Sequence, residues 1–111
     1  MEKEIIILNK PVKILLTKTE CGINVLITGG DFAHIGVVSI VDPQGEIFTK
    51  TFEGHKDNFV SVEWAEKLYK KFNIPVVVSV GIHYDNIDYT GIENVISEMK
   101  KALDEVLKKL D

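Results

Sequence analysis

The chain has 111 residues, of which 45% are hydrophobic and 27% are charged. This length suits one domain with its own core, and this composition is typical of a folded globular protein rather than a disordered one. The formal net charge is −4, and all 13 basic residues are lysines. Because arginine is the usual reader of guanine edges and of paired phosphate oxygens, this balance argues against a nucleic-acid-binding protein. We expect a single domain over residues 1–111.

The cysteine content and the N-terminal residues indicate a compartment. Cys21 is the single cysteine, so no intramolecular disulfide can form. The first apolar run, Ile5 to Leu8, is too short for the hydrophobic region of a signal peptide or for a membrane span. Together these features predict a cytoplasmic protein.

The first half of the chain has the residue pattern of β-strands. Residues 12–17 and 23–28 are separated by a connection that contains glycine, which predicts a hairpin. Residues 35–41 and 47–52 flank an Asp-Pro-Gln-Gly sequence that fits a type I turn, which predicts a second hairpin. Residues 4–8 are a candidate for an additional N-terminal strand.

The second half alternates helix, strand and helix. Ala65, Leu68 and Phe72 have helical spacing, and i,i+4 pairs of glutamate and lysine support a helix over residues 61–72, whose cap is either Asp57 or Ser61. The β-branched run at 75–80 predicts a strand in the centre of the sheet.

The last segment predicts a long amphipathic helix that opens with a Thr-Gly-Ile-Glu capping box at residues 90–93. The fold class is therefore α/β (α+β), with two main helices packed on a single mixed or antiparallel sheet. The expected order is β-β-β-β-α-β-α.

Each of the three histidines lies in a short cluster of glycine and small polar residues that follows or flanks an apolar run. The clusters cover residues 28–36, 54–59 and 81–86. Polar groups at strand ends and helix entries are where open α/β sheets hold ligands. The clusters are therefore the candidate functional residues of the chain.

Each cluster also has a purely structural interpretation. Gly29-Gly30 either presents backbone N–H groups to an anion or forms a turn. Residues 55–58 place an imidazole, a cation, a carboxylate and an amide before a helix, where the alternative is a helix cap beside solvated side chains. His34 taken alone is an ordinary loop histidine. His83 follows the predicted central strand, and it is the strongest single candidate.

Two kinds of enzyme are weaker alternatives. A small metal-dependent enzyme would use His34, His55 and His83, but no HxH, HxxxH or HExxH motif is present. A hydrolase would need an activated nucleophile, and neither Cys21 nor any serine lies in a motif that activates one. A third alternative is an interaction or assembly module that binds no small molecule.

Three motifs resemble those of a known family: Thr-Gly-Gly-x-x-x-His-Ile-Gly at 28–36, His-Lys-Asp-Asn-Phe-Val-Ser at 55–61 and Gly-Ile-His at 81–83. The chain resembles the small D subunit of bacterial gallate decarboxylase over residues 23–92. That family is described as a prenylated-flavin chaperone, and its fold is related to the proteasome assembly chaperones. The stretches at 31–33 and 84–86 depart from the family pattern.

The resemblance implies a noncatalytic partner of a decarboxylase that uses prenylated FMN, and we expect no metal site. It implies non-covalent handling of that cofactor by a homodimer. Backbone donors and a lysine would hold the phosphate, while imidazole and amide groups would shelter the ring. The positions that match the family pattern are Gly29, Gly30, His34, Gly36, His55, Lys56, Asp57, Asn58, Phe59, Gly81 and His83.

Overall fold

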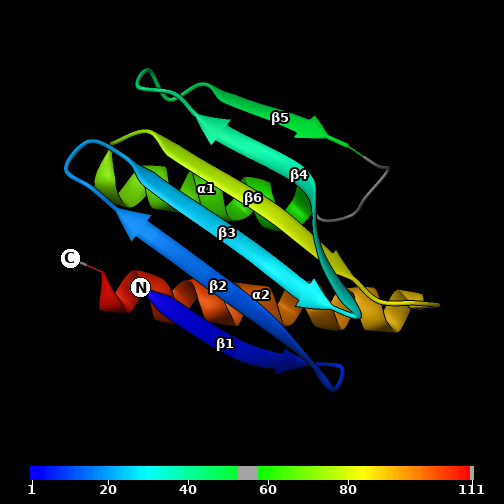
Figure 1. The fold of residues 1–111 in the computed structure, drawn as a ribbon. Helices are drawn as coiled ribbons and strands as arrows, with labels where there is room; N and C mark the ends of the chain where they lie inside the picture. The colour runs from blue at the N-terminus through cyan, green and yellow to red at the C-terminus, as the bar shows by residue number, and fades with distance from the viewer. Residues whose placement is uncertain (53–57, 111) are drawn as a thin grey trace.

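The computed structural model describes residues 1–52 and 58–110, which form a six-stranded sheet and two helices (Figure 1). In chain order the elements are β1 (Glu2–Ile7), β2 (Lys10–Lys18), β3 (Ile23–Gly30), β4 (Phe32–Val41), β5 (Ile47–Thr51), α1 (Asn58–Phe72), β6 (Val76–His83) and α2 (Tyr89–Lys109). The predicted order is confirmed, and the candidate N-terminal strand is present as β1.

The strands are arranged in the order β1-β2-β3-β6-β4-β5. β3 and β6 are parallel, and every other neighbouring pair is antiparallel. Both predicted hairpins are confirmed as β2–β3 and β4–β5. The predicted central strand is β6, which lies between β3 and β4.

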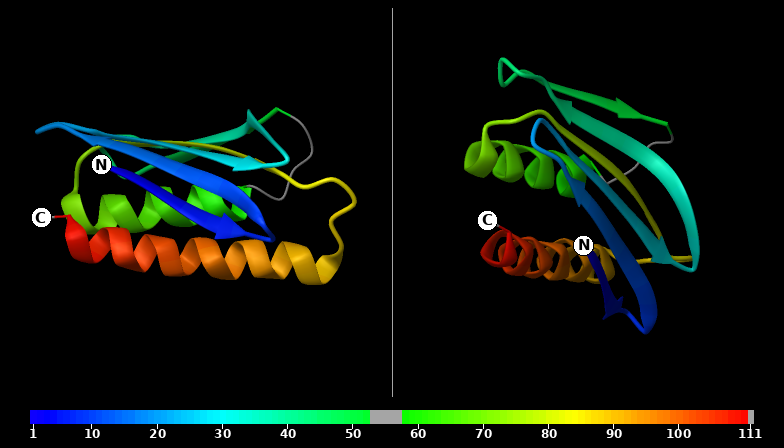
Figure 2. Two further views of the ribbon diagram at one scale, coloured as in Figure 1. Left: turned by 60° about the horizontal axis from the view of Figure 1, so that its bottom comes forward. Right: turned by 60° about the vertical axis from the view of Figure 1, so that its left-hand side comes forward.

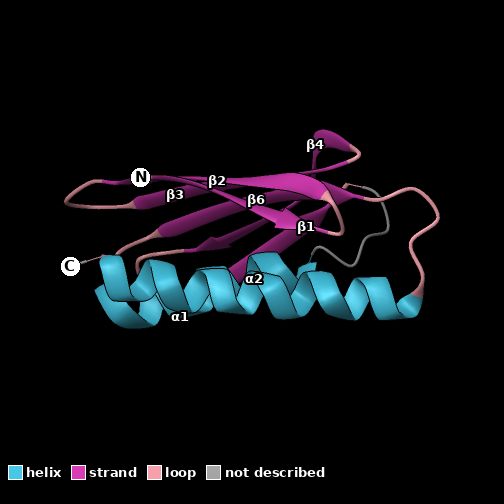
Figure 3. Cartoon of the chain, turned by 90° about the horizontal axis from the view of Figure 1, so that it is seen from below, coloured by secondary structure: helices cyan, strands magenta, loops and turns pink. Residues whose placement is uncertain are grey.

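Both helices cover the same face of the sheet, and within the described part of the chain the opposite face carries no helix (Figures 2 and 3). In β2, the buried residues Val12, Ile14 and Leu16 alternate with exposed ones, so one side of the strand faces the helices. Among the described residues, neither helix combines the length and the apolarity that crossing a membrane requires. The helices complete the core with Trp64, Ala65, Leu68, Val95, Met99, Ala102, Leu103 and Val106.

The start of α1 differs from the prediction. The helix begins at Asn58, so Ser61 lies inside it and is not its cap. The Ser61 hydroxyl donates to the Asn58 carbonyl at 3.3 Å and is 2.8 Å from the Ser39 hydroxyl of β4. Ser61 therefore ties the first turn of the helix to the sheet. The alternative cap, Asp57, lies outside the described residues.

The start of α2 also differs from the prediction. The N-cap is Asp88, whose carboxylate accepts a hydrogen bond from the Gly91 N–H at 2.8 Å. Thr90 therefore lies within the first turn, and the predicted capping box from Thr90 to Glu93 is wrong. The N-cap lies two residues before Thr90 because Asp88 already satisfies a free N–H group of the first turn.

We expect Asp88→Ala to lower the free energy of unfolding by about 1 kcal/mol, because the Gly91 N–H loses its acceptor. Thr90→Ala is the matched control and should change it by less than about 0.5 kcal/mol. Urea unfolding followed by circular dichroism measures both. A larger loss for Thr90→Ala than for Asp88→Ala would restore the capping box.

Candidate functional site

The link between β3 and β4 passes over the end of β6. Gly30, the last residue of β3, is paired with His83 on one side of β6, and Phe32, the first residue of β4, is paired with His83 on the other. Between them, the Asp31 N–H donates to the His83 carbonyl at 2.7 Å. His83 is therefore enclosed on both sides by backbone from the first cluster.

Gly30 makes this passage possible. Its φ of +85° lies in the left-handed region that favours glycine. A Cβ at this position would also overlap the His83 carbonyl oxygen and lie 2.9 Å from the His83 carbonyl carbon. A side chain at residue 30 would push the β3–β4 link away from His83.

Gly81 has a similar role two residues earlier in β6. The register between β4 and β6 shifts between Ala33 and Val37, which marks an irregularity in β4. There the His34 backbone approaches Gly81 so closely that a Cβ on Gly81 would overlap the His34 carbonyl group and lie 3.0 Å from the Ile35 nitrogen. Glycine at position 81 therefore allows β4 to bring His34 to the end of β6.

Three flat side chains meet at this point, and we call Phe32, His34 and His83 the ring cluster. The Phe32 ring centroid lies 4.4 Å from that of His83 and 5.3 Å from that of His34. The two imidazoles are 6.2 Å apart, and their planes are at 82°. These separations are those of interacting aromatic rings. Phe32 is 53% exposed, so the ring cluster presents an accessible aromatic surface.

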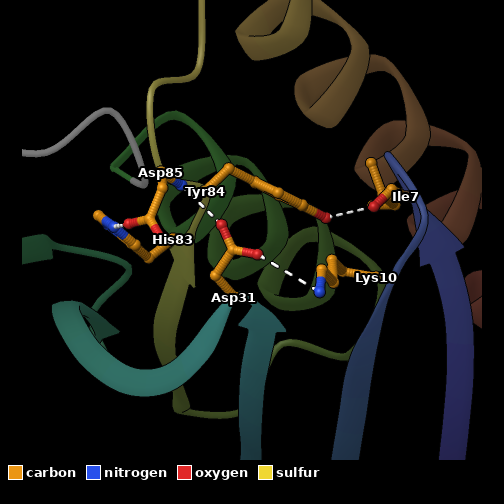
Figure 4. A network of polar contacts seen from close by, with 6 residues as sticks. All are labelled: Ile7, Lys10, Asp31, His83, Tyr84 and Asp85. Atoms are coloured by element: carbon orange, nitrogen blue, oxygen red, sulfur yellow. Dashed lines mark hydrogen bonds and ion pairs between the residues drawn. The ribbon is translucent and has the colours of Figure 1, made fainter.

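Two carboxylates hold the backbone and side chain of the third cluster (Figure 4). His83 Nε2 lies 2.9 Å from Asp85 Oδ1, so the ring donates its N–H to this carboxylate. The Asp85 N–H in turn donates to Asp31 Oδ2 at 2.7 Å, and the Lys10 ammonium lies 3.7 Å from Asp31 Oδ1. Asp31 thus joins the β1–β2, β3–β4 and β6–α2 connections, and it fixes the segment that orients His83.

Tyr84 is a buried residue that directly follows His83. It is 9% exposed, and its hydroxyl donates to the Ile7 carbonyl at 2.6 Å (Figure 4). Burial, and secondly the negative charge of Asp31, raises the pKa of the Tyr84 hydroxyl above its ordinary value. Tyr84 is therefore a tie between β1 and the end of β6.

We expect Tyr84→Phe to lower the free energy of unfolding by about 1 to 2 kcal/mol at neutral pH, because the Ile7 carbonyl loses its donor. The raised pKa means that the unfolded chain releases this proton first. The contribution of Tyr84 is therefore present below pH about 10 and is lost as the pH rises further. Between pH 8 and pH 10.5, the free energy of unfolding measured with urea should fall less in Tyr84→Phe than in the wild type. An equal loss in both would contradict this origin.

The structure brings some of the predicted site residues together and leaves others apart. His34 and His83 meet, with Gly30 and Gly81 packed against their backbones. Gly29 is paired within the sheet with Val12 and Ile82, and Gly36 extends the β4–β5 pairing by accepting a hydrogen bond from Phe52 at 2.7 Å. The glycines thus have packing and pairing roles, and contact between Gly29-Gly30 and a phosphate stays a prediction.

The second cluster lies at the start of α1. Asn58 and Phe59 form the first turn of the helix and line a groove between α1 and α2. Their described contacts are with the helix layer. His55, Lys56 and Asp57 lie outside the described residues.

Sequence reasoning placed three further residues that build the site, Asp31, Phe32 and Asp85, inside the candidate clusters, but not among the positions proposed to bind the cofactor. All three lie in the stretches that depart from the family pattern. The usable signal was their position, since an aspartate and an aromatic residue between two strands, and an aspartate two residues after His83, recur at ligand sites. Tyr84 is buried, and it lines a pocket together with Lys10 and Asp31.

The metal alternative receives no support from the part of the chain that is described. Within residues 1–52 and 58–110, no group of three or more histidine, cysteine, aspartate or glutamate residues is arranged to hold an ion. The nearest approach to such a group is the pair formed by His83 and Asp85.

The fold of this chain is also found in a solved structure. The crystal structure of a novel chaperone complex for yeast 20S proteasome assembly has this fold, with a TM-score of 0.62 and 16% sequence identity over 99% of this chain and 98% of that one. At this identity the likeness concerns the fold alone.

The family is defined by the sequence. The model of the prenylated flavin chaperone LpdD-like domain matches residues 8–111, and the chain belongs to this family. This match confirms the resemblance that the three motifs indicated. No curated protein matches the chain.

Proposed function

We propose that this chain is a noncatalytic accessory protein that binds prenylated FMN non-covalently and delivers it, in the cytoplasm, to a decarboxylase that depends on this cofactor. The observation that carries the proposal is the ring cluster, formed where β3, β4 and β6 meet, in a chain that belongs to a prenylated-flavin-chaperone family. Gallate decarboxylase is the partner that the motif resemblance favours.

The ring cluster fits one part of this cofactor. A flavin has a flat, largely apolar ring system that stacks on aromatic side chains, and Phe32 and His83 offer neighbouring rings with centroids 4.4 Å apart. The His83 side chain is 33% exposed, so it is accessible to a ligand while Asp85 fixes its orientation. When bound, the cofactor supplies the reactive ring on which the decarboxylase depends.

The charges around the ring cluster constrain where the phosphate lies. Asp31 and Asp85 are both beside His83, and a phosphate placed against them would be repelled. We therefore assign the phosphate to the second cluster, where Lys56 would supply the cation and His55 and Asn58 would supply further hydrogen-bond donors. Gly30 and Gly81 allow the close backbone approaches that form the ring cluster.

We also propose that the protein is a homodimer that pairs through the face of the sheet without helices. We call this surface the outer sheet face. In β4 and β5 it carries Ile40 and Phe48, which are paired across the strands and are both exposed. Apolar residues extend this surface across the central strands, which are usually buried on both faces. The outer sheet face consists of Leu15, Leu26, Val38, Ile40, Phe48 and Val77.

Anaerobic titration with prenylated FMN, followed by absorbance and by native mass spectrometry, tests cofactor binding. We expect saturable binding by the wild-type chain and binding at least about tenfold weaker in Phe32→Ala and His83→Ala, because each removes a stacking surface. Tyr89→Ala is the matched control, since this side chain is 75% exposed outside the ring cluster. Absence of binding by the wild-type chain would refute the proposal.

A further inference from the structure

The helix layer has a groove that shares only its first residues, Asn58 and Phe59, with the proposed cofactor site. It lies between α1 and α2 and encloses about 740 Å³. Its apolar lining comes from Phe59 and Val62 of α1 and Ile96 of α2. Phe59 is 62% exposed although it is a large apolar residue in the first turn of a helix. An exposed aromatic beside an apolar groove is typical of an anchor point for another protein.

The groove is long and straight. Its α1 lining residues recur every three or four positions from Phe59 to Lys70, so they form one stripe along the helix. This stripe spans eleven steps of the helix, or about 16 Å. The α2 side adds Ile96 and Lys100, which are one turn apart. A stripe of this length suits a helix that lies along it better than a compact small molecule.

The rim of the groove is more basic than the rest of the chain. Three lysines, Lys67, Lys70 and Lys100, stand against two glutamates, Glu63 and Glu66, in a chain whose net charge is −4. Glu63 is paired across the groove with Lys100 at 3.2 Å instead of with Lys67. Among the described residues, Lys67 and Lys70 form no ion pair, so two ammonium groups are available to a ligand.

We infer that this groove docks an acidic amphipathic helix of the enzyme that receives the cofactor. Apolar side chains of that helix would cover Phe59, Val62 and Ile96, while its carboxylates would meet Lys67 and Lys70. The groove begins at Asn58 and Phe59, which belong to the second cluster, so the docked enzyme would lie beside the proposed phosphate site. The identity of the partner as an enzyme rests on the proposed function; the chemistry of the helix rests on the groove.

Two designed peptides of about 18 residues, long enough to span the groove, test this inference. One carries leucines on one face and glutamates on the other, and its twin has lysines in place of the glutamates. Titration into the full ¹⁵N-labelled chain should move the amide signals of Phe59, Val62 and Ile96 with the acidic peptide. The basic twin should bind at least about tenfold more weakly, because the lysine rim repels it.

Charge reversal supplies the matched variant. Lys67→Glu combined with Lys70→Glu changes only exposed side chains, so the fold should persist, and the preference between the two peptides should invert. Equal binding of both peptides, or signal changes confined to the outer sheet face, would overturn the inference. The same variant should bind prenylated FMN as the wild type does. A wild-type chain that binds the cofactor but neither peptide would therefore refute the groove and leave the proposed function standing.

Discussion

Gly81→Ala is expected to lower the free energy of unfolding by about 3 kcal/mol and to weaken prenylated FMN binding at the same time. The added methyl group would overlap the His34 carbonyl, which is a backbone group and cannot rotate away. Either β4 must separate from β6, or β6 must shift within a sheet where it is paired on both sides. Both adjustments displace His34 from His83. The variant should therefore lose both stability and the arrangement of the ring cluster.

Gly22→Ala is the matched control for this substitution. A Cβ at Gly22 would lie 3.7 Å from the Pro75 carbonyl oxygen, which is an ordinary van der Waals contact. We expect its effect on the free energy of unfolding to be within about 0.5 kcal/mol. Urea unfolding of both variants measures the difference. If Gly81→Ala were as stable as Gly22→Ala, the close approach of β4 to β6 would be wrong.

Phe48→Glu is expected to convert the proposed dimer into a monomer. Phe48 is 53% exposed on the edge strand β5 and lies beside Ile40 on the outer sheet face. In a dimer paired through this face, a glutamate here would be buried without a partner, which costs several kcal/mol. The dissociation constant should rise by about a hundredfold or more.

Sedimentation equilibrium of the full chain measures this change in mass. Tyr89→Glu is the control, because it introduces the same charge at an exposed aromatic residue on the helix layer. It should leave the dimer intact. A wild-type chain that sediments as a monomer, or a Phe48→Glu variant that remains dimeric, would contradict pairing through the outer sheet face.

Much of this fold follows from short-range patterns in the sequence. The alternation at Val12, Ile14 and Leu16 identified a strand with one buried face because side chains of a strand point alternately to its two sides. The β-branched run before Gly81, interrupted only by Ser79, identified β6 as central. A strand with neighbours on both sides and apolar contacts on both faces needs few polar residues. Such patterns involve residues that are close in sequence, so they can be recognised without knowledge of the tertiary structure.

The helix starts show where local signals compete. Asp88 and Thr90 are both good N-cap residues, and the glutamate at position 93 favoured Thr90. The side chain of Asp88 reaches the Gly91 N–H first, so the chain enters the helix earlier. For α1, Ser61 has a partner in β4 that no local pattern reveals.

The candidate site depends on contacts that are distant along the chain. His34 and His83 were each identified as candidates, but their meeting depends on the β3–β4 link passing over the end of β6. Asp31 acquires its role only because the β6–α2 connection places the Asp85 N–H within 2.7 Å of it. No periodicity or spacing encodes that juxtaposition. The sequence therefore identified the histidines but not the contacts of Asp31 and Asp85 that hold them in place.

The most direct test of the central claim observes the histidine side chains themselves. The chain has three histidines, so ¹³C labelling of their imidazoles gives three Cε1 signals, which single substitutions assign. On anaerobic addition of prenylated FMN, the signals of His34 and His83 should shift together and saturate at the same cofactor concentration. Binding of the cofactor that leaves both signals unchanged would place the site elsewhere and contradict the account.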